Sequence, residues 1–287
     1  GDRLTAMPSL PATMYAPTVR AALAEDLGTA GDLTSDAAIP EDATAVAEIV
    51  AREPGCLAGI DVATCAFHMM DPDAVMTREV EDGAAIDAGT VLARIEGRAR
   101  AMLGAERTAL NFLGRLCGIA TATQTAVAAV AGTKARIACT RKTTPGLRHL
   151  EKYAVRMGGG RNHRFGLHDA VLIKDNHLVA GGGIEATVAR VRARIGHLVK
   201  IQVEVDTQAQ LDELLATDAD AVLLDNMTPD QLRTAVASVA GRLTTEASGG
   251  IRPETLQAVA ATGVDVISLG WLTHSAPSLD VGLDFRA

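Results

Sequence analysis

The chain has 287 residues, of which 48% are hydrophobic and 22% are charged, and its formal net charge is −8. A chain of this length and composition can bury a substantial core, and it has no apolar run long enough to span a bilayer. One Trp, two Tyr and four Phe give few platforms for base stacking, so neither nucleic acid nor a membrane is an expected partner.

The first part of the chain predicts a separate α+β domain. Helical periodicity covers residues 14–27, and strand-like stretches follow at 46–51, 75–80 and 91–95. A longer helix over about 104–130 leads into the second part. Four polar side chains in and just before this segment share one helical face, which is a candidate lining for a site or an interface. They are Arg100, Arg107, Asn111 and Arg115.

From about residue 135 onward, short apolar runs alternate with helix-period segments. The runs are 135–139, 170–173, 201–205, 221–224, 243–247 and 264–269. The helical segments are 185–195, 208–216, 229–239 and 253–261. Serial β-α-β order requires parallel strands, and near-continuous apolar runs predict burial on both faces. The unit lengths favour an α/β barrel, closed or incomplete, over an open doubly wound sheet.

The four cysteines, Cys56, Cys65, Cys117 and Cys139, show no CxxC spacing and no histidine pairs at zinc-ligand intervals. They are therefore expected to be buried, reduced residues in a cytoplasmic protein. The first residues also lack the basic and apolar regions of a signal peptide, so export is not expected.

A basic window lies between Lys134 and Lys174. It holds ten Lys or Arg residues against Glu151 and Asp169, a local charge of +8, so the rest of the chain sums to −16. A cationic focus on an acidic body attracts small anions. The simpler alternative is a solvated charged helix face. Interleaved glycines and histidines, and the strand at 170–173, favour a segment that lines a ligand pocket.

Polar residues or glycines end most of the predicted strands. Parallel strands would bring these ends to the carboxyl rim of a barrel, where catalytic groups lie. The strand-end residues are Thr140, Arg141, Lys142, Lys174, Glu204, Asp225, Ser248 and Gly270. Glu204 and Asp225 would neutralise Lys142 or Lys174, or would bind Mg²⁺ or ligand hydroxyls.

Two glycine-containing strand ends are candidates for phosphate binding. Ser248-Gly249-Gly250 follows one strand and precedes a helix, and Gly270 ends the next strand. Glycine lets backbone N–H groups approach a phosphate closely, and a helix N-terminus adds partial positive charge.

Several longer motifs closely resemble the quinolinate phosphoribosyltransferase family. They include Glu106-Arg107-Thr108, Thr140-Arg141-Lys142-Thr143-Thr144-Pro145-Gly146, Asn162-His163-Arg164, Lys174-Asp175-Asn176-His177, Glu204-Val205-Asp206, Asp225-Asn226 and Ser248-Gly249-Gly250-Ile251. The resemblance runs from about Leu23 to Asp280. It implies an N-terminal α/β sandwich over residues 1–117 and an incomplete seven-strand α/β barrel over 118–274, with the tail 275–287 packed back on the sandwich.

The resemblance also implies an activity. Members of this family convert quinolinate and phosphoribosyl pyrophosphate, with Mg²⁺, into nicotinate mononucleotide, CO₂ and diphosphate in NAD biosynthesis. They form homodimers with shared active sites, and in some cases hexamers.

Site residues follow from the same resemblance. Arg107 would reach quinolinate across the dimer interface, while barrel residues surround its carboxylates. These barrel residues are Thr140, Arg141, His163, Arg164 and Lys174. Lys142 and Lys174 would contact phosphoribosyl pyrophosphate, with Glu204 and Asp225 on the ribose and Mg²⁺. The loop of Ser248, Gly249 and Gly250 would hold the 5′-phosphate together with Gly270. The implied catalytic residues are Lys142, Lys174, Glu204 and Asp225.

Three other functions fit parts of the pattern. A phosphoribosyltransferase-like protein associated with molybdenum transport would share the fold and differ in the acceptor. A Schiff-base aldolase would use Lys142 or Lys174 as its nucleophile. A non-enzymatic polyanion binder would use the basic window but would leave Glu204 and Asp225 without a role.

Overall fold

The computed structural model describes residues 9–286, which form two compact units. The first combines the chain up to residue 124 with residues 143–159 and the chain from 272 onward, and the second comprises 125–142 and 160–271. Within the described residues, no helix has both the length and the apolarity needed to cross a membrane. The fold is α/β, with an antiparallel sheet in the first unit and a parallel sheet in the second, as expected.

The first unit is built on a four-stranded antiparallel sheet in the order β12-β1-β5-β3. Its strands are β1 (Thr44–Ala51), β3 (Val75–Arg78), β5 (Val91–Arg98) and β12 (Val281–Arg286), and a separate pair comprises β2 (Gly55–Cys56) and β4 (Ala85–Ile86). The three predicted strands are confirmed. The edge strand β12 was not predicted, because its partner β1 lies more than 200 residues earlier in the sequence.

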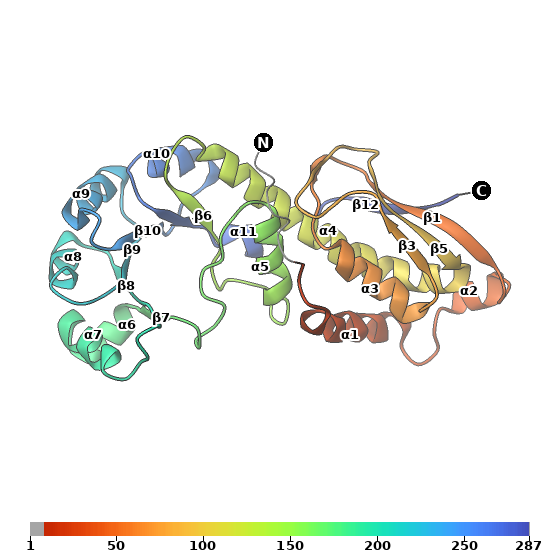
Figure 1. Ribbon diagram of the computed structural model, residues 1–287, viewed down its shortest axis with the longest axis horizontal. Coiled ribbons are helices and arrows are strands. Elements are labelled where there is room, and N and C mark those ends of the chain that lie inside the picture. The colour runs from red at the N-terminus through yellow and green to blue at the C-terminus, as the bar shows by residue number, and fades with distance from the viewer. Residues whose placement is uncertain (1–8, 287) are drawn as a thin grey trace. The chain divides into compact units, whose positions relative to one another are not determined.

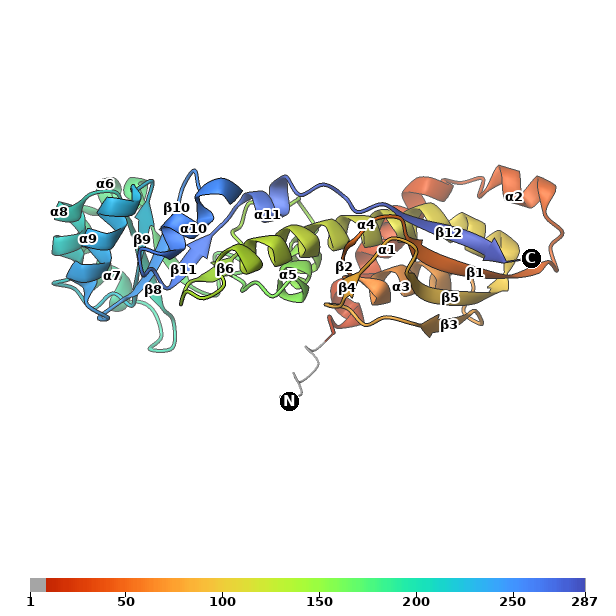
Figure 2. The same ribbon diagram turned by 90° about the horizontal axis from the view of Figure 1, so that it is seen from above.

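Helices cover this sheet (Figures 1 and 2). They are α1 (Ala16–Leu27), α2 (Leu33–Ala38), α3 (Ile60–Met70) and the first part of α4 (Ala99–Ala129). The first unit also contains a short 3₁₀ turn η1 (Ala12–Met14), the helix α5 (Arg148–Met157) and most of the four-residue α11 (Trp271–His274). On α4, Leu110, Leu113 and Leu116 are buried while Arg107 and Asn111 are exposed, so the predicted separation of an apolar and a polar face is confirmed for these residues.

Arg115 on α4 has a structural role inside the first unit. Its Nη2 atom lies 2.9 Å from Oε1 of the fully buried Glu151 on α5, and its Nη1 donates to the carbonyl of Ala276 at 3.0 Å. A buried carboxylate needs such a partner, because an unpaired charge in the interior is very unfavourable. Arg115 therefore joins three segments of the chain and is not part of a polar stripe that lines a site.

The second unit contains a six-stranded parallel sheet in the order β6-β11-β10-β9-β8-β7. The strands are β6 (Arg136–Ala138), β7 (Val171–Ile173), β8 (Ile201–Val205), β9 (Ala221–Asp225), β10 (Thr244–Ser248) and β11 (Val266–Ser268). All six predicted strands are confirmed. The seventh strand of the expected barrel is reduced to one bridge between Arg161 and Ala138.

Helices follow the strands of this sheet and lie along its outer side (Figure 1). They are α6 (Asp175–Gly181), α7 (Ile184–Arg192), α8 (Gln208–Leu214), α9 (Pro229–Val239) and α10 (Leu256–Ala260), preceded by the 3₁₀ turn η2 (Pro253–Thr255). Thr207 and Thr228 cap α8 and α9 by accepting from the backbone N–H groups of Gln210 and Gln231. Pro229 occupies the first turn of α9, where a missing N–H costs no hydrogen bond.

The two faces of the parallel sheet differ in chemistry. Successive strand residues point to opposite faces, so Val203 and Val205 of β8 share the apolar face. Gln202 and Glu204 share the other face, and Glu246 lies on that same face of β10. The predicted burial on both faces is confirmed for β8, β9 and β10, and the inner face carries polar side chains even where it is buried.

The basic window does not form one continuous ligand-lining segment. It contains α5, a helix that was not predicted, on which Lys152 is fully buried and Arg156 lies 5.5 Å from the centre of the Tyr153 ring. Lys134 pairs with Asp265 at 2.8 Å. Lys134 and Arg156 of the basic window therefore have structural partners. Only part of the window belongs to the strand ends of the second unit.

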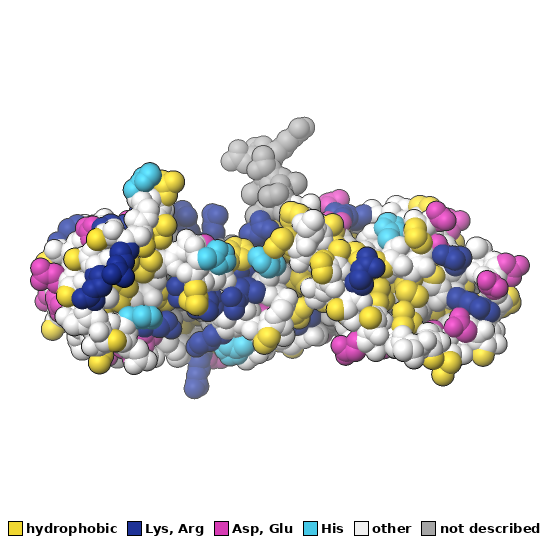
Figure 3. All heavy atoms as spheres, turned by 90° about the horizontal axis from the view of Figure 1, so that it is seen from below, with side chains coloured by type: hydrophobic (Ala, Val, Ile, Leu, Met, Phe, Trp, Pro, Cys, Tyr) yellow, Lys and Arg dark blue, Asp and Glu magenta, His cyan; other side chains and the backbone are white. Residues whose placement is uncertain are grey.

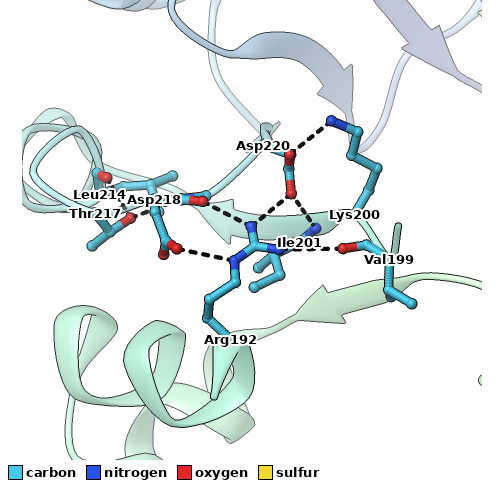
Figure 4. Close-up of polar contacts among 9 residues, drawn as sticks. Arg192, Val199, Lys200, Ile201, Leu214, Thr217, Asp218 and Asp220 are labelled. Carbon is cyan, nitrogen blue, oxygen red and sulfur yellow. Dashed lines mark hydrogen bonds and ion pairs between the residues drawn. The ribbon is translucent and has the colours of Figure 1, made fainter. Parts of the chain in front are cut away.

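An ion-pair cluster fixes the amino-terminal edge of the parallel sheet (Figure 4). Asp220 accepts from Arg192 Nη2, Lys200 Nζ and the backbone N–H of Ile201, each at 2.8 Å. Partial burial raises the pKa of Asp220, but these donors outweigh burial and hold the pKa at about 2. Such contacts at the amino-terminal side of a barrel serve stability.

We predict that Asp220→Ala lowers the free energy of unfolding by about 2 kcal/mol, because three donors lose their acceptor. The matched control is Asp218→Ala, which removes an exposed pair with Arg192 and should cost no more than about 0.5 kcal/mol. Urea titrations measure both values. Equal losses in the two variants would contradict the account.

The same cluster predicts a pH dependence. The folded-state pKa of Asp220 is depressed, so its contribution is present above its ordinary pKa and is lost as pH falls toward 2. The stability difference between the wild-type protein and Asp220→Asn should therefore shrink between pH 4 and pH 2.

Candidate active site

The carboxyl ends of β8, β9 and β10 bring three predicted site residues to one rim. Ser248 pairs in register with Asp225, and Glu204 pairs with Leu223, which lies two residues before Asp225. Because side chains alternate along a strand, Glu204, Asp225 and Ser248 all project to the inner face of the sheet. The predicted convergence of these three residues is observed.

Two carboxylates and two lysines influence one another at this rim. Burial raises the pKa of Glu204; Lys174 opposes this effect, and Asp225 adds to it. The pKa of Asp225 is also raised, first by burial and then by Asp206, while Lys174 and Lys142 favour its charged form. Lys174 thus lies within electrostatic range of both carboxylates, and Lys142 lies within range of Asp225. Asp206, two residues after Glu204, adds negative charge that sequence reasoning had not singled out.

The loop after β10 requires glycine at position 249. Its φ angle is +90°, and a Cβ atom there would lie 2.6 Å from Cγ and 2.9 Å from the backbone nitrogen of Asn226. Asn226 itself has a φ of 52°, donates its backbone N–H to the Ser248 carbonyl at 2.9 Å and donates Nδ2 to Asp225 at 2.6 Å. Asn226 therefore couples the predicted phosphate loop to the carboxylate on the neighbouring strand.

Two other segments of the second unit carry cationic residues. Thr140, Arg141 and Lys142 follow β6, where the backbone N–H of Lys142 donates to Thr140 Oγ1 at 3.0 Å. Arg164 belongs to the segment after Arg161 and donates Nη1 to the Ala170 carbonyl at 3.1 Å. Figure 3 shows Lys and Arg side chains gathered beside histidines on one face of the molecule.

Arg141 and Arg164 form a like-charged pair. Burial lowers the pKa of Arg164, and the charge of Arg141 lowers it further, while Asp169 acts in the opposite direction. Asp169 is itself held by the backbone N–H groups of Phe165 and Gly166, at 2.8 and 2.9 Å. Two guanidinium groups in electrostatic range of each other are suited to an anion with two carboxylates.

Arg107 does not belong to this group of residues. It lies exposed on α4 in the first unit, whereas the other predicted site residues lie in the second unit. Gly270 follows β11 at the same edge as Ser248. Within one chain, the structure therefore groups every predicted site residue except Arg107 in the parallel-sheet unit.

The chemistry of this edge fits a divalent cation that is shared with a ligand. Among the described residues, no group of three or more His, Cys, Asp or Glu side chains could hold a metal ion alone. Glu204 and Asp225 provide two carboxylates whose raised pKa values reflect burial and repulsion by neighbouring acids. Mg²⁺ is commonly held by one or two carboxylates together with substrate phosphates.

Comparison with known proteins identifies the family. Residues 119–284 match the C-terminal domain of quinolinate phosphoribosyl transferase, and residues 32–117 match its N-terminal domain. The chain belongs to the quinolinate phosphoribosyltransferase family.

Similar members of the family come from several organisms. A probable nicotinate-nucleotide pyrophosphorylase (carboxylating) of Bacillus subtilis is 46% identical over 260 residues, covering 91% of this chain and 89% of its own length. The nicotinate-nucleotide pyrophosphorylase (carboxylating) of Mycobacterium leprae is 46% identical over 273 residues, covering 93% and 95%. The solved nicotinate-nucleotide pyrophosphorylase of Francisella tularensis is 37% identical, with a TM-score of 0.93 and coverage of 97% and 98%.

We predict that the ionised side chain of Glu204 lowers the free energy of unfolding. The folded-state pKa of Glu204 is raised, so its ionised form is disfavoured by folding and is less of a penalty as pH falls. We expect Glu204→Gln to raise the free energy of unfolding by about 0.5–1 kcal/mol at pH 7.5, a difference that narrows toward pH 4.

Asp265→Asn provides the matched contrast in the same sheet. The pKa of Asp265 is lowered, because the donors Lys134 and Thr245 outweigh the effect of burial, so its removal should destabilise the protein. Denaturant titrations at both pH values measure the two effects. A loss of stability in both variants would contradict the proposed repulsion.

Proposed function

We propose that this protein transfers the phosphoribosyl group of phosphoribosyl pyrophosphate to quinolinate and releases CO₂ and diphosphate, forming nicotinate mononucleotide. The observation that carries the proposal is the presence of two opposite charge sets within the parallel-sheet unit. Arg141 and Arg164 supply cations for a dicarboxylate, while Glu204 and Asp225 supply carboxylates beside Lys142 and Lys174.

The guanidinium groups account for the choice of acceptor. Arg recognises planar carboxylates through paired N–H donors, and quinolinate carries two carboxylates on adjacent ring carbons. A nicotinate acceptor has one carboxylate and would leave more of the repulsion between Arg141 and Arg164 uncompensated. Thr140, His163 and Lys174 are the proposed neighbours of the same ligand.

The phosphoribosyl donor would lie along the carboxyl ends of β8 to β11. Ser248, Gly249, Gly250 and Gly270 are the proposed contacts of the 5′-phosphate, because glycine permits close approach of backbone N–H groups. Glu204 and Asp225 would hold ribose hydroxyls and a Mg²⁺ ion. When bound, that ion would neutralise charge on the diphosphate.

The residues are suited to a dissociative glycosyl transfer. The bond between C1 of ribose and the diphosphate oxygen breaks as the pyridine nitrogen approaches, and positive charge develops on the sugar. Glu204 and Asp225 stabilise that charge, and Lys142 and Lys174 stabilise the departing diphosphate. The ring nitrogen of the product is then cationic. The bond to the C2 carboxylate breaks with its electrons drawn into this ring, and a proton replaces CO₂.

A homodimer completes the proposal. Arg107 lies on a different compact unit from the rest of the site residues, and in the proposed assembly the partner subunit supplies it. A symmetric dimer would provide two such shared sites.

The acceptor assay tests the proposed function. With phosphoribosyl pyrophosphate and Mg²⁺, quinolinate should give nicotinate mononucleotide and CO₂ in equal amounts, and nicotinate should be a much poorer acceptor. Lys142→Ala should reduce turnover at least about 100-fold, because it removes a charge aimed at the leaving group. A preference for nicotinate would favour a related transferase with another acceptor, and would overturn the proposal.

A glycine pair tests the phosphate loop. Gly249→Ala should raise the KM for phosphoribosyl pyrophosphate at least about tenfold, because the new Cβ would displace Asn226 and strain a backbone with positive φ. Gly241→Ala is the matched control, since Gly241 also has a positive φ of 76° but has no atom within 4 Å of a built Cβ. It should lower stability while leaving this KM within about twofold of the wild-type value. Equal KM changes would contradict the assignment.

A further inference from the structure

A connected set of polar side chains lies inside the second unit, below the predicted substrate residues. His163 Nε2 lies 2.9 Å from Gln202 Oε1, and Gln202 Nε2 donates to Glu246 Oε2 at 2.8 Å. The His163 ring nitrogen and the Glu246 carboxylate are 3.5 Å apart. The three residues come from the loop after Arg161, from β8 and from β10. The set therefore links three separate segments of the chain.

The position of the set is fixed by strand periodicity. Gln202 lies two residues before Glu204, and Glu246 lies two residues before Ser248, so each points to the same inner face as a proposed substrate residue. Glu246 is only 4% exposed. A carboxylate in such a place is retained only when polar partners compensate its burial. Neither Gln202 nor Glu246 has a role in the proposed chemistry.

The hydrogen-bond roles follow from one another. An ionised carboxylate only accepts hydrogen bonds, so Glu246 turns the amide nitrogen of Gln202 toward itself. The Gln202 oxygen must then face His163, which places the ring proton on Nε2. The other ring nitrogen, Nδ1, is left as an acceptor, and it accepts the backbone N–H of Arg164 at 2.9 Å. Glu246 thus acts through Gln202 and His163. It determines that Nδ1 of His163 accepts the backbone N–H of Arg164.

The electrostatics agree with an ionised Glu246. Burial opposes ionisation, but the hydrogen bonds from His163 and Gln202 hold the pKa of the carboxyl below its ordinary value.

The set of polar side chains borders a cavity on one side. A cavity of about 290 Å³ is lined by His163, Arg164, Gln202 and Glu246, together with Ala221 and Thr244 among others. Protein interiors normally restrict side chains by close packing. On the side that faces the cavity, hydrogen bonds restrict the orientation of His163 and Arg164.

We propose that Glu246 is a positioning residue for the quinolinate site, acting through Gln202 and His163 on Arg164. This inference rests on the proposed function, because it takes Arg164 as a ligand of the quinolinate carboxylates. Glu246 does not touch the substrate. In the observed geometry both ring nitrogens of His163 are engaged by the protein, so His163 transmits the orientation and does not offer a ring nitrogen to quinolinate.

Exchanging the carboxylate of Glu246 and the amide of Gln202 tests the hydrogen bonds that link Glu246 to His163. Glu246→Gln removes the obligatory acceptor, so Gln202 is free to turn, and the KM for quinolinate should rise at least about tenfold. Gln202→Glu places two carboxylates side by side and should be at least as damaging. In the double variant the carboxylate at position 202 accepts from His163 directly and the amide at 246 donates to it. The tautomer is restored, so the KM for quinolinate should return to within about threefold of wild type.

The KM for phosphoribosyl pyrophosphate distinguishes a positioning role from a purely structural one. The KM for phosphoribosyl pyrophosphate should change less than about twofold in all three variants. Asp265→Asn is the matched control, because this carboxylate just before β11 does not line the cavity and its loss should lower stability without altering either KM. If Glu246→Gln does not fold, Gln202→Met breaks the same link with little change in volume and is measured in the same way.

The outcomes separate this inference from the proposed function. A wild-type protein that does not convert quinolinate would overturn the proposed function and with it this inference. A wild-type protein that converts quinolinate, with an unchanged quinolinate KM in Glu246→Gln or Gln202→Met, would overturn the positioning role alone. Parallel increases in both KM values, or no recovery in the double variant, would also contradict it.

Discussion

The site depends on the alternation of side chains along the strands of a parallel sheet. The outer face of β8 is apolar and buried beneath helices, with Val203 and Val205 in its core. The inner face of the same strand carries Gln202 and Glu204. Because the two faces are independent, an apolar exterior can stabilise the sheet while the interior holds charges that contribute nothing to hydrophobic burial. The proposed chemistry therefore uses the inner face of a barrel that is not closed by a regular seventh strand.

The site also places side chains of like charge within electrostatic range of each other. Burial and neighbouring acids raise the pKa of Glu204, and burial and Arg141 lower that of Arg164. Neither arrangement favours folding of the free protein. Both are suited to a ligand of opposite charge, because the protein has already oriented the groups before the ligand binds. The ion pairs around Asp220, which lines the same cavity as Arg164, show the opposite arrangement, because Asp220 is paired with Arg192 and Lys200 inside the protein.

Much of the fold and of the site was predictable from local signals. Apolar runs followed by Glu204, Asp225 and Ser248 located three strand ends, and strand direction then implied that these residues share one rim. The family motifs identified Arg164 and Gly249. Gln202 and Glu246 were missed because they lie within strands and not at their ends. A polar residue in mid-strand has no distinctive sequence signal until the register shows which face it occupies.

Two structural elements were missed for other reasons. The helix α5 lies within a basic stretch, and its charges suggested a ligand-lining segment. In the structure Glu151 pairs with Arg115, a residue 36 positions earlier, and Lys152 is buried. The strand β12 pairs with β1 across most of the chain length, and no local pattern encodes that pairing. Long-range pairing is the part of the fold that short sequence patterns do not contain.

The structure of the protein bound to quinolinate and to an unreactive analogue of phosphoribosyl pyrophosphate tests the central claim most directly. The account predicts carboxylates on Arg141 and Arg164, ribose hydroxyls on Glu204 and Asp225, and the 5′-phosphate on the loop from Ser248 to Gly250. It also predicts that His163 keeps its contacts with Gln202 and the Arg164 backbone. Quinolinate bound away from the two arginines, or a phosphate bound away from that loop, would contradict the account.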